Sequence, residues 1–407
     1  MLNGFSPPDI TEAEIQAVVD ALRSGWITTG PRTKEFEAAL CDITGTARVA
    51  ALSSATAALE TALRILGIGC GDEVITTAYT YTASASVICH VGATPVLCDT
   101  EPGSYQMNYD ALAALVTPRT KAVIAVDYAG VICDYTSLIA QLNAVKSLFT
   151  PTKGTLQENF LRVPVIADAA HSLGAVKDGR SSGMHADFTA FSFHAVKNLT
   201  TAEGGALTWH QLPDNPTPFN NEWLYHEVML HSLHGQDRDA LSKQGAGLWE
   251  YDIVSALYKC NMTDIQAALG LAQLSRYDAL LTRRHELVSL YDAALSALVN
   301  NDSIQTLAHF NQNFASSCHL YPIRINGFSE TDRNALIAKL ASKSIPTNVH
   351  YKPLPMLTAY KKLGFNIADF PNAYKQYANE ITLPLHTLLD DDDINLVADA
   401  LLKAYTN

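Results

Sequence analysis

Short apolar runs alternate with amphipathic stretches over the first half of the chain. Runs rich in valine, isoleucine and alanine predict strands at 47–52, 73–76, 94–98, 121–126, 163–167, 188–193 and 205–209. Helical patterns separate most of the first five runs, as at 55–66 and 81–90. Apolar strands linked by helices are typical of parallel sheets. The pattern therefore predicts an α/β fold with a mostly parallel seven-stranded sheet and helices on both faces. A loop joins the last two strands, so an antiparallel edge is expected there.

The flanking segments predict a second, smaller unit. Thr11 and Glu14 have the spacing of a capping box, which predicts a helix through Arg23. Residues 141–162 are long for one connection and predict a surface loop or a local insertion. A long helical pattern begins at Thr263 and is expected to break near 276–280, and a smaller α+β pattern follows from about 315. We therefore expect a large domain over 1–262 and a smaller one over 263–407.

Charge and cysteine content narrow the classes of partner. The 407 residues include 28 Lys+Arg and 41 Asp+Glu, a formal net charge of −13, which argues against nucleic acid or an anionic membrane as partner. There is no apolar run long enough to span a bilayer, and the first residues lack the pattern of a secretory signal. The seven cysteines are odd in number and none are spaced Cys-x-x-Cys. The sequence therefore predicts a cytoplasmic protein with free, buried thiols.

Lys197 is the first candidate for chemistry, within FSFHAVKNLTTAEGGA. A lysine in a loop is ordinarily a solvated surface residue. Here it follows directly on an apolar strand, and Gly204 and Gly205 permit close approach of the backbone. A partly desolvated lysine has a lowered pKa and attacks carbonyl carbon, so Lys197 is a candidate Schiff-base lysine.

Asp168 is the second candidate, at the end of the apolar run in VPVIADAAH. Ligands of α/β folds bind at the carboxyl ends of the strands. Alone, Asp168 is equally explained as a helix cap. Beside a Schiff-base lysine, its carboxylate has a specific use, because it keeps a pyridine nitrogen protonated and so maintains the electron sink of pyridoxal phosphate (PLP). His171 is then either a partner that holds the site or a satisfied core histidine.

Two further strand ends carry candidate cofactor contacts. In LSSATAAL, a strand ends at small hydroxylated residues and a helix begins, which offers free N–H groups to a phosphate, although an ordinary Ser/Thr cap explains the same residues. In TTAYTY, an aromatic side chain follows a strand end. It can stack on a planar cofactor or simply pack in the core.

Taken together and in order, these segments resemble the sugar-nucleotide aminotransferases of the DegT/DnrJ/EryC/StrS family, a branch of PLP fold type I. The likeness runs from about Gly25 to the C-terminus. The motifs that carry it are SSATAAL, GDEVIT, TPRTKAVI, ADAAHS, FSFHAVKNLTTAEGGA, YKCNMTDIQAALG and the TRR-x-E segment at 282–286. Within the family, the chain looks most like the 4-aminotransferases that make UDP-4-amino-4-deoxy-L-arabinose.

The resemblance implies PLP as cofactor, L-glutamate and 2-oxoglutarate as the amino donor pair, and a nucleotide-linked keto sugar, aminated at the 4-keto position, as acceptor. It implies a Schiff base on Lys197 and pairing of Asp168 with the pyridine nitrogen. It further implies cofactor contacts from Ala55, Thr56, Tyr81, His171 and Ser192. Asn261 would reach the phosphate of the neighbouring subunit, so the resemblance implies a homodimer with shared active sites. Expected substrate contacts are His194, Arg238, His350 and Tyr351.

Some residues depart from the family pattern, and other functions were weighed. Tyr81 stands where some close relatives have tryptophan, and Ala55 where glycine is more usual. A PLP-dependent dehydratase of the same fold carries histidine in place of the lysine, and a non-catalytic regulator is expected to lose Lys197 or Asp168, whereas both are present. A Rossmann oxidoreductase needs Gly-x-Gly-x-x-Gly after the first strand, where this chain has SSATAA.

Overall fold

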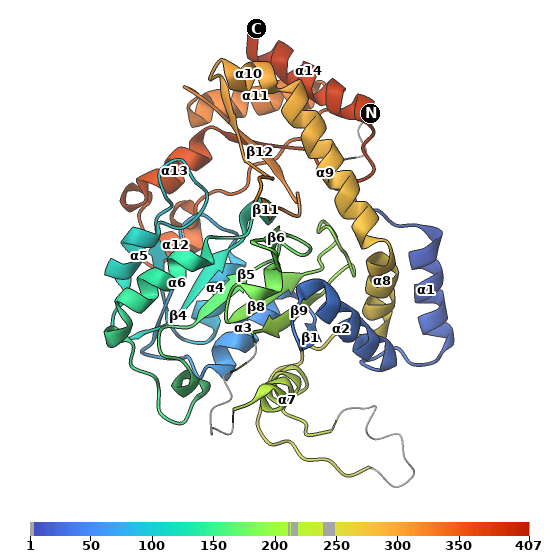
Figure 1. Ribbon diagram of the computed structural model, residues 1–407, viewed down its shortest axis with the longest axis vertical. Helices are drawn as coiled ribbons and strands as arrows, with labels where there is room; N and C mark the ends of the chain where they lie inside the picture. Colours follow the sequence, from blue (N-terminus) through green and yellow to red (C-terminus); the bar gives the residue numbers. More distant parts are fainter. Residues whose placement is uncertain (1–3, 211, 213–218, 239–248, 407) are drawn as a thin grey trace.

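A seven-stranded sheet lies at the centre of the computed structural model, which describes residues 4–210, 212, 219–238 and 249–406 (Figure 1). Its order is β1-β9-β8-β5-β4-β2-β3. The strands are β1 (Val49–Leu52), β2 (Glu73–Thr77), β3 (Thr94–Cys98), β4 (Thr120–Val126), β5 (Val165–Asp168), β8 (Phe188–Ser192) and β9 (Gly205–Trp209). All seven predicted strands are therefore confirmed, with ends that shift by one or two residues.

The antiparallel strand lies inside the sheet and not at its edge. β9 pairs antiparallel with β8, as the joining loop predicts, but it also pairs antiparallel with β1 on its other side. The remaining neighbours pair in parallel. The expected antiparallel edge is thus wrong in position, because β1 adds to β9 and takes the edge itself. Since β1 lies antiparallel to β9, it runs in the same direction as β8.

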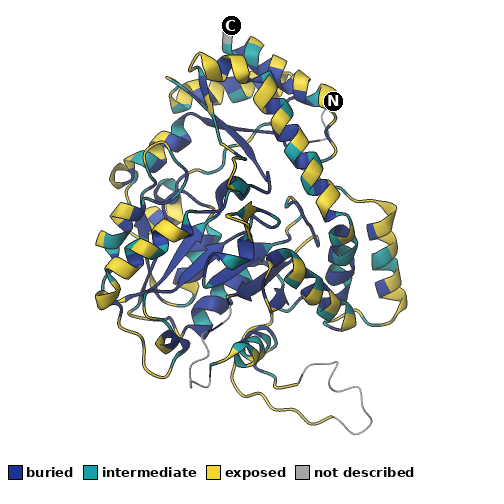
Figure 2. Cartoon of the chain, in the orientation of Figure 1, coloured by how far each residue is buried: buried dark blue, intermediate teal, exposed yellow. Residues whose placement is uncertain are grey.

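Helices cover both faces of this sheet, as expected. On β4, Ala122 and Ile124 belong to one apolar cluster, whereas Val123 and Ala125 belong to the other, the two-residue period of a strand buried on both sides. One face packs against α2 (Pro31–Thr44), α5 (Tyr109–Leu115), α6 (Tyr135–Ala144) and α8 (Asp264–Ser275), and the other against α3 (Ala55–Ile65), α4 (Ala83–His90) and α7 (Asn221–Ser232). The sheet is accordingly buried over most of its length, with Thr94 at the start of the edge strand β3 exposed (Figure 2).

The connection at 141–162 is more ordered than expected. It begins within α6 and continues through short 3₁₀ turns at Lys146–Leu148 and Leu156–Asn159. Leu156 is fully buried, and the Gln157 side-chain amide donates to the Leu66 carbonyl over 2.8 Å. A buried leucine and a hydrogen bond from a buried side-chain amide anchor this segment, so it is a packed connection that returns to the sheet at β5.

The C-terminal part is built on a second, antiparallel sheet of order β10-β12-β13. Its elements are β10 (Ile304–Thr306), β12 (Tyr321–Ile325), β13 (Glu380–Leu383), α9 (Tyr277–Ala294), α10 (Ser296–Asn300), α11 (Glu330–Ser342), α12 (Thr358–Lys362), α13 (Pro371–Ala378) and α14 (Asp391–Thr406). A third, small sheet pairs β11 (Phe314–Ala315) with β6 (Val176–Lys177), which pairs in turn with β7 (Arg180–Ser181), so segments from both parts of the chain meet there.

The long helical segment breaks at Arg276, as predicted, and this break separates two packing environments. Before it, α8 contacts α2 and α1 (Glu12–Arg23); after it, α9 runs to the C-terminal part and contacts α14 (Figure 1). The helix from Thr11 with its Glu14 capping box is also confirmed. The domain boundary between residues 262 and 263 stays a prediction.

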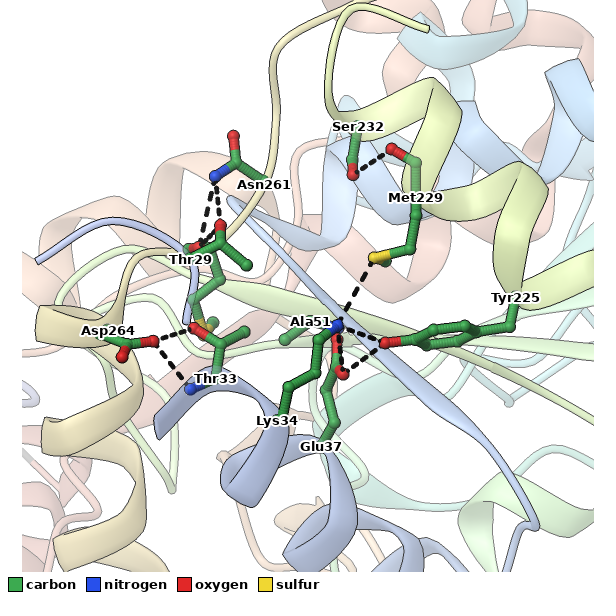
Figure 3. A network of polar contacts seen from close by, with 11 residues as sticks. Thr29, Thr33, Lys34, Glu37, Ala51, Tyr225, Met229, Ser232, Asn261 and Asp264 are labelled. Atoms are coloured by element: carbon green, nitrogen blue, oxygen red, sulfur yellow. Dashed lines mark hydrogen bonds and ion pairs between the residues drawn. The ribbon is translucent and has the colours of Figure 1, made fainter. Parts of the chain in front are cut away.

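The edge strand β1 is covered by polar groups from α2 and α7. Glu37 accepts the backbone N–H of Ala51 over 2.9 Å, and the Tyr225 hydroxyl donates to the same carboxylate over 2.7 Å (Figure 3). Lys34 forms an ion pair with Glu37 at 3.2 Å. An unpaired strand edge invites pairing with another chain. Satisfying the Ala51 N–H with a buried carboxylate removes part of that edge.

α1 is fixed to the rest of the molecule by one buried carboxylate. Glu14 is fully buried and accepts from Arg276 Nε over 2.7 Å and from Gln273 Nε2 over 3.0 Å. Burial alone raises the pKa of this carboxyl, but hydrogen bonds from Thr11 and Arg276 outweigh it and lower the pKa from 4.5 to about 2. The folded protein therefore stabilises the ionised form.

Glu14→Gln is expected to lower the free energy of unfolding by about 1–3 kcal/mol, because a buried charge-assisted network loses its charge. The difference from wild type should be complete above pH 4.5, where Glu14 is ionised in both states, and should shrink as the pH falls toward 2. Urea unfolding at several pH values measures it. Glu12→Gln, an exposed residue in the same helical turn, is the control. Equal losses in the two variants would contradict the assignment.

Candidate active site

A cavity of about 370 Å³ opens at the carboxyl ends of the parallel strands. The ends of β5 and β8, the turn after β2 and the first residues of α3 line it, together with residues 350–351 of the C-terminal part. The predicted site residues among its lining are Ala55, Thr56, Tyr81, Asp168, His171, Ser192, His194, Lys197, His350 and Tyr351. Side chains from five separate segments thus converge where α/β folds bind ligands.

Lys197 lies in a turn after β8, where its backbone N–H donates to the carbonyl of His194 over 2.9 Å. Burial lowers the pKa of its amine from 10.5 to about 8, and the charge of Asp168 partly opposes that shift. An amine with this pKa is substantially neutral near pH 8. The desolvated nucleophile expected from the sequence is therefore present in the fold.

Asp168 ends β5 and is buried, with a hydroxyl aimed at it. Ser84 Oγ donates to Asp168 Oδ2 over 2.6 Å, and the Ala170 N–H donates to Oδ1 over 3.3 Å. Burial raises the pKa of Asp168, while these two hydrogen bonds and the charge of Lys197 act in the opposite direction. A protonated ring nitrogen in the cavity would favour the carboxylate further, because an adjacent cation stabilises the anion.

The first turn of α3 forms a cradle for an anion. Ser54 caps the helix by accepting the Ala57 N–H over 3.0 Å, and the N–H groups of Ala55 and Thr56 precede any intrahelical acceptor. Gly205 of β9 lies directly against this turn, and a Cβ there would come within 2.2 Å of the Ser54 carbonyl carbon. The close backbone approach expected at Gly204 and Gly205 is thus found at Gly205, which packs against the first turn of α3.

Tyr81 offers an aromatic face to the cavity. Its side chain is 61% exposed although it lies among buried segments, and its ring centroid is 5.9 Å from that of Tyr351. The expected helix start at residue 81 is wrong, since α4 begins at Ala83. Tyr81 therefore lies in the turn before the helix, and core packing does not account for its position.

His171 is both a satisfied buried residue and part of the cavity wall. The Ala129 N–H donates to its Nδ1 over 3.2 Å, so the neutral ring carries its hydrogen on Nε2, 3.1 Å from the Tyr351 hydroxyl. Burial is the main cause of its pKa lying well below the ordinary value, with Lys197 adding to the effect. The sequence left open whether His171 is a core histidine or a residue of the site, and the structure shows both properties in this residue.

Three predicted residues lie at the rim or outside. His194 lies at the rim, exposed, with Nε2 3.7 Å from a carboxylate oxygen of Glu203. Asn261 lies outside this cavity, where its side-chain amide donates to Thr29 (Figure 3). Arg238 is exposed and also lies outside, with Nη1 3.4 Å from the Glu250 carbonyl. Neither of the last two contacts the site of its own chain.

Sequence reasoning missed three residues in and around the cavity wall. Thr80 and Ser84 are 2.8 Å apart, and since the Ser84 hydroxyl donates to Asp168, Thr80 donates to Ser84. Their separation of four residues beside a strand end is a signal that could have found them. Asn198 connects the lysine turn to the C-terminal part by donating to the Ser317 carbonyl over 2.6 Å and accepting from His319 over 2.9 Å, and nothing in the local sequence indicates this.

The described residues contain no group of three or more His, Cys, Asp or Glu side chains that could hold a metal ion. None of the helices in the described part of the chain is long and apolar enough to cross a membrane. All seven cysteines are free thiols, but Cys70 and Cys89 are exposed, so the expectation that the thiols are buried is wrong for these two.

Comparison with known proteins agrees with this geometry over the whole chain. Residues 8–402 match the DegT/DnrJ/EryC1/StrS aminotransferase family. The chain belongs to this family. It is 36% identical over 401 residues to the spore coat polysaccharide biosynthesis protein SpsC of Bacillus subtilis, a match that covers 98% of this chain and 95% of the relative.

Solved structures give the same result. The putative sugar aminotransferase Spr1654 from Streptococcus pneumoniae, in its PMP form, is 51% identical with a TM-score of 0.94, covering 99% of this chain and 98% of that one. Its PLP form is 50% identical with a TM-score of 0.92 over 99% and 98% of the two chains. Helicobacter pylori PseC, described as an aminotransferase in pseudoaminic acid biosynthesis, is 29% identical with a TM-score of 0.85 over 99% and 98%.

This aminotransferase therefore has the PLP fold type I that the motifs predicted, and PLP is its cofactor. The cavity fits that group by its chemistry: it presents an amine of lowered pKa, a hydrogen-bonded buried carboxylate, a helix N-terminus and an exposed aromatic face. Lys197 and Asp168 are both in place, which contradicts the loss expected of a dehydratase or a regulator.

The rate at which the apoenzyme captures PLP covalently should rise with pH and level off above about 8, because the lowered pKa of Lys197 makes the amine neutral there. Stopped-flow absorbance measures the rate, and a free lysine derivative in the same buffers corrects for ionisation of PLP itself. An apparent pKa near the ordinary 10.5 would show that burial does not activate this lysine.

Proposed function

We propose that this aminotransferase transfers the amino group of L-glutamate to the 4-keto position of a nucleotide-linked sugar. The observation that carries the proposal is the chemistry of the cavity wall. Apart from Lys197, the residues described in its lining include no lysine or arginine, whereas His171, His350 and Tyr351 present neutral rings and a hydroxyl. The carboxylates of glutamate need a cation that this wall does not itself supply. The neutral hydrogen-bonding groups that it does supply suit the hydroxyl groups of a sugar ring.

Each residue of the cavity then has a task. The first N–H groups of α3 and the Ser192 hydroxyl bind the cofactor phosphate. Tyr81 packs on one face of the ring, and Asp168, oriented by Ser84, holds a proton on the ring nitrogen. Bound there, PLP supplies an electron sink for the carbon that loses a proton. Lys197 binds the cofactor covalently and, once released, moves the proton at Nζ between substrate carbon and cofactor carbon.

The names of the relatives support the acceptor class. Sugar aminotransferase is the description given to the pneumococcal protein, and polysaccharide biosynthesis is that given to SpsC. The His350 and Tyr351 turn belongs to the C-terminal part and forms part of the wall of the cavity that Lys197 also lines. We propose that this wall contacts the sugar. The seven free thiols support a cytoplasmic location.

We further propose a homodimer in which each subunit contributes to the other's site. Apolar side chains are exposed along one stretch near Asn261, namely Trp249, Tyr251, Ile253, Val254 and Tyr258. Such a patch on a folded protein is a candidate interface. Because Asn261 and Arg238 do not contact the cavity of their own chain, contact with the partner's cavity gives both residues a role: Asn261 at the cofactor phosphate, Arg238 at an anionic substrate group.

Glutamate should convert the PLP form to the pyridoxamine phosphate form, and a UDP- or dTDP-linked 4-keto sugar should restore it. Free 2-oxo acids other than 2-oxoglutarate should do so about 100-fold more slowly or worse, because they leave the wall's hydrogen-bonding groups unmatched. Single-turnover absorbance follows both half-reactions. Asp168→Asn, of equal size but neutral, is the control and should retain PLP while losing most of the rate. Efficient restoration by free 2-oxo acids alone would refute the sugar substrate.

Lys197→Ala and Asn261→Ala proteins should each be inactive, yet mixing them should restore activity. A mixed dimer contains one site with both defects and one with neither, so random exchange should recover about a quarter of the wild-type sites. Steady-state turnover after mild denaturant exchange measures it. Exchange is verified separately with an affinity tag on one variant. Verified exchange without recovery would mean that Asn261 does not serve the partner's site.

A further inference from the structure

The wall that carries His350 is held by β13 of the C-terminal sheet. Asn348 and Thr382 exchange backbone hydrogen bonds of 3.1 and 2.8 Å, which places residue 350 just beyond the end of this pairing. The His350 N–H then donates to Glu380 Oε2 over 3.0 Å. The Tyr79 and Tyr128 hydroxyls both donate to the His350 carbonyl, over 2.7 and 2.6 Å. The backbone of this histidine is therefore fixed on both sides.

A second connection runs from the same carboxyl group to the imidazole ring. Glu380 Oε1 lies 2.5 Å from Thr382 Oγ1, and Thr382 Oγ1 lies 2.9 Å from His350 Nδ1. Glu380 and Thr382 are fully buried, and neither lines the cavity. His350 does line it, and within the described part of the chain its Nε2 has no hydrogen bond partner. The buried Thr382 hydroxyl thus contacts the ring at Nδ1, on the side opposite Nε2, and the buried Glu380 carboxyl group contacts that hydroxyl.

The Thr382 hydroxyl has one hydrogen, so the two hydrogen bonds that link Glu380, Thr382 and His350 must run in the same direction. When Glu380 is ionised, Thr382 donates to the carboxylate and accepts from His350 Nδ1–H, which leaves Nε2 as an acceptor. When Glu380 is protonated, its O–H donates to Thr382, and Thr382 donates to Nδ1, so the ring hydrogen lies on Nε2. The protonation state of Glu380 thereby selects the tautomer.

We propose that Glu380 and Thr382 are positioning residues that set the tautomer of His350 and so decide whether its Nε2 accepts a hydrogen bond from the substrate or donates one to it. This inference rests on the proposed function, in which the His350 wall contacts the sugar. With Nε2 as acceptor the wall binds a sugar hydroxyl, and with Nε2–H as donor it binds a keto oxygen or another acceptor.

The surroundings keep the ring neutral while the carboxyl group titrates. Burial, aided by the charge of Lys197, lowers the pKa of His350 to about 3. Burial raises the pKa of Glu380 from 4.5 to about 8, against hydrogen bonds from Thr382 and His350 and the charge of Arg333. The ring is therefore neutral well above pH 3, so when Glu380 loses its proton near pH 8 the tautomer is the only property of the ring that changes.

The other titratable or charged groups that face this pair come from several elements. Those that interact with Glu380 are Tyr79, Tyr105, Tyr128, Tyr351 and Arg333, and Arg324 is its cross-strand neighbour on β12. Those that interact with His350 are Lys197, His171 and His319. The buried phenols have pKa values above the ordinary 10. Apart from Lys197, Glu380 is the group here with a pKa near 8.

Glu380→Gln tests the direction of these hydrogen bonds, because a side-chain amide has a fixed donor and a fixed acceptor and cannot change roles by gaining or losing a proton. Its carbonyl must accept the His350 N–H, so its NH₂ faces Thr382 and forces that hydroxyl to donate to Nδ1. In PLP-loaded enzyme labelled with ¹⁵N-histidine, wild-type His350 should pass from Nε2–H to Nδ1–H as the pH rises through about 8. The glutamine variant should stay Nε2–H throughout. A His350→Gln protein assigns the signal. The same pH response in both proteins would overturn the proposal.

Kinetics provide the second arm. Above pH 8, where wild-type His350 carries its hydrogen on Nδ1, Glu380→Gln should lower kcat/KM for the keto sugar about tenfold, the scale of one unmatched buried hydrogen bond, and leave the glutamate half-reaction unchanged. Well below pH 8 the variant and wild type should react alike. Thr382→Val removes the hydroxyl that connects Glu380 to His350, whereas Thr382→Ser keeps it, so only the valine variant should reproduce the loss. These two variants decide the question if the Glu380→Gln protein does not fold. Equal effects of valine and serine would overturn the proposal. If no keto sugar reacts with wild type, the proposed function fails, while the ¹⁵N spectra still decide the tautomer.

Discussion

Desolvation of Lys197 beside Asp168 is the constraint on which the site depends. Placing an amine in a cavity walled by protein lowers its pKa to about 8, which makes it a nucleophile, and the same burial raises the pKa of the carboxyl group. The hydrogen bond from Ser84 opposes that rise and keeps the carboxylate accessible to a cation. One environment thus prepares both groups for a cofactor that needs a covalent lysine and a paired ring nitrogen.

The sheet creates this environment because parallel strands end together. β5 and β8 deliver Asp168 and the lysine turn to one edge, and β1, which runs in the same direction, delivers the first turn of α3. The antiparallel strand β9 between them supplies Gly205, whose missing side chain lets the phosphate-binding turn lie against the sheet. The departure from a purely parallel sheet therefore serves the site directly.

The C-terminal part completes the cavity from the other side. Backbone pairing of Asn348 with β13 and the Glu380 carboxyl group hold residue 350, and the Tyr79 and Tyr128 hydroxyls, which follow β2 and β4 of the larger sheet, donate to its carbonyl. The two parts of the chain are therefore connected through the site itself. Buried groups that never touch the ligand, such as Glu380 and Ser84, orient those that do, and this separation allows specificity to change without disturbing the lysine and its carboxylate.

The sequence by itself determined the seven strands, the helix break at Arg276 and the residues around Lys197, because apolar period, caps and motif spacing are local properties of the chain. Only the tertiary structure decided that β9 lies inside the sheet, that Tyr81 precedes its helix, and that Asn261 and Arg238 lie away from their own cavity. It alone brought Ser84 to Asp168 and Glu380 to His350. Contacts between residues tens to more than a hundred positions apart depend on how elements pack, and no local pattern records that.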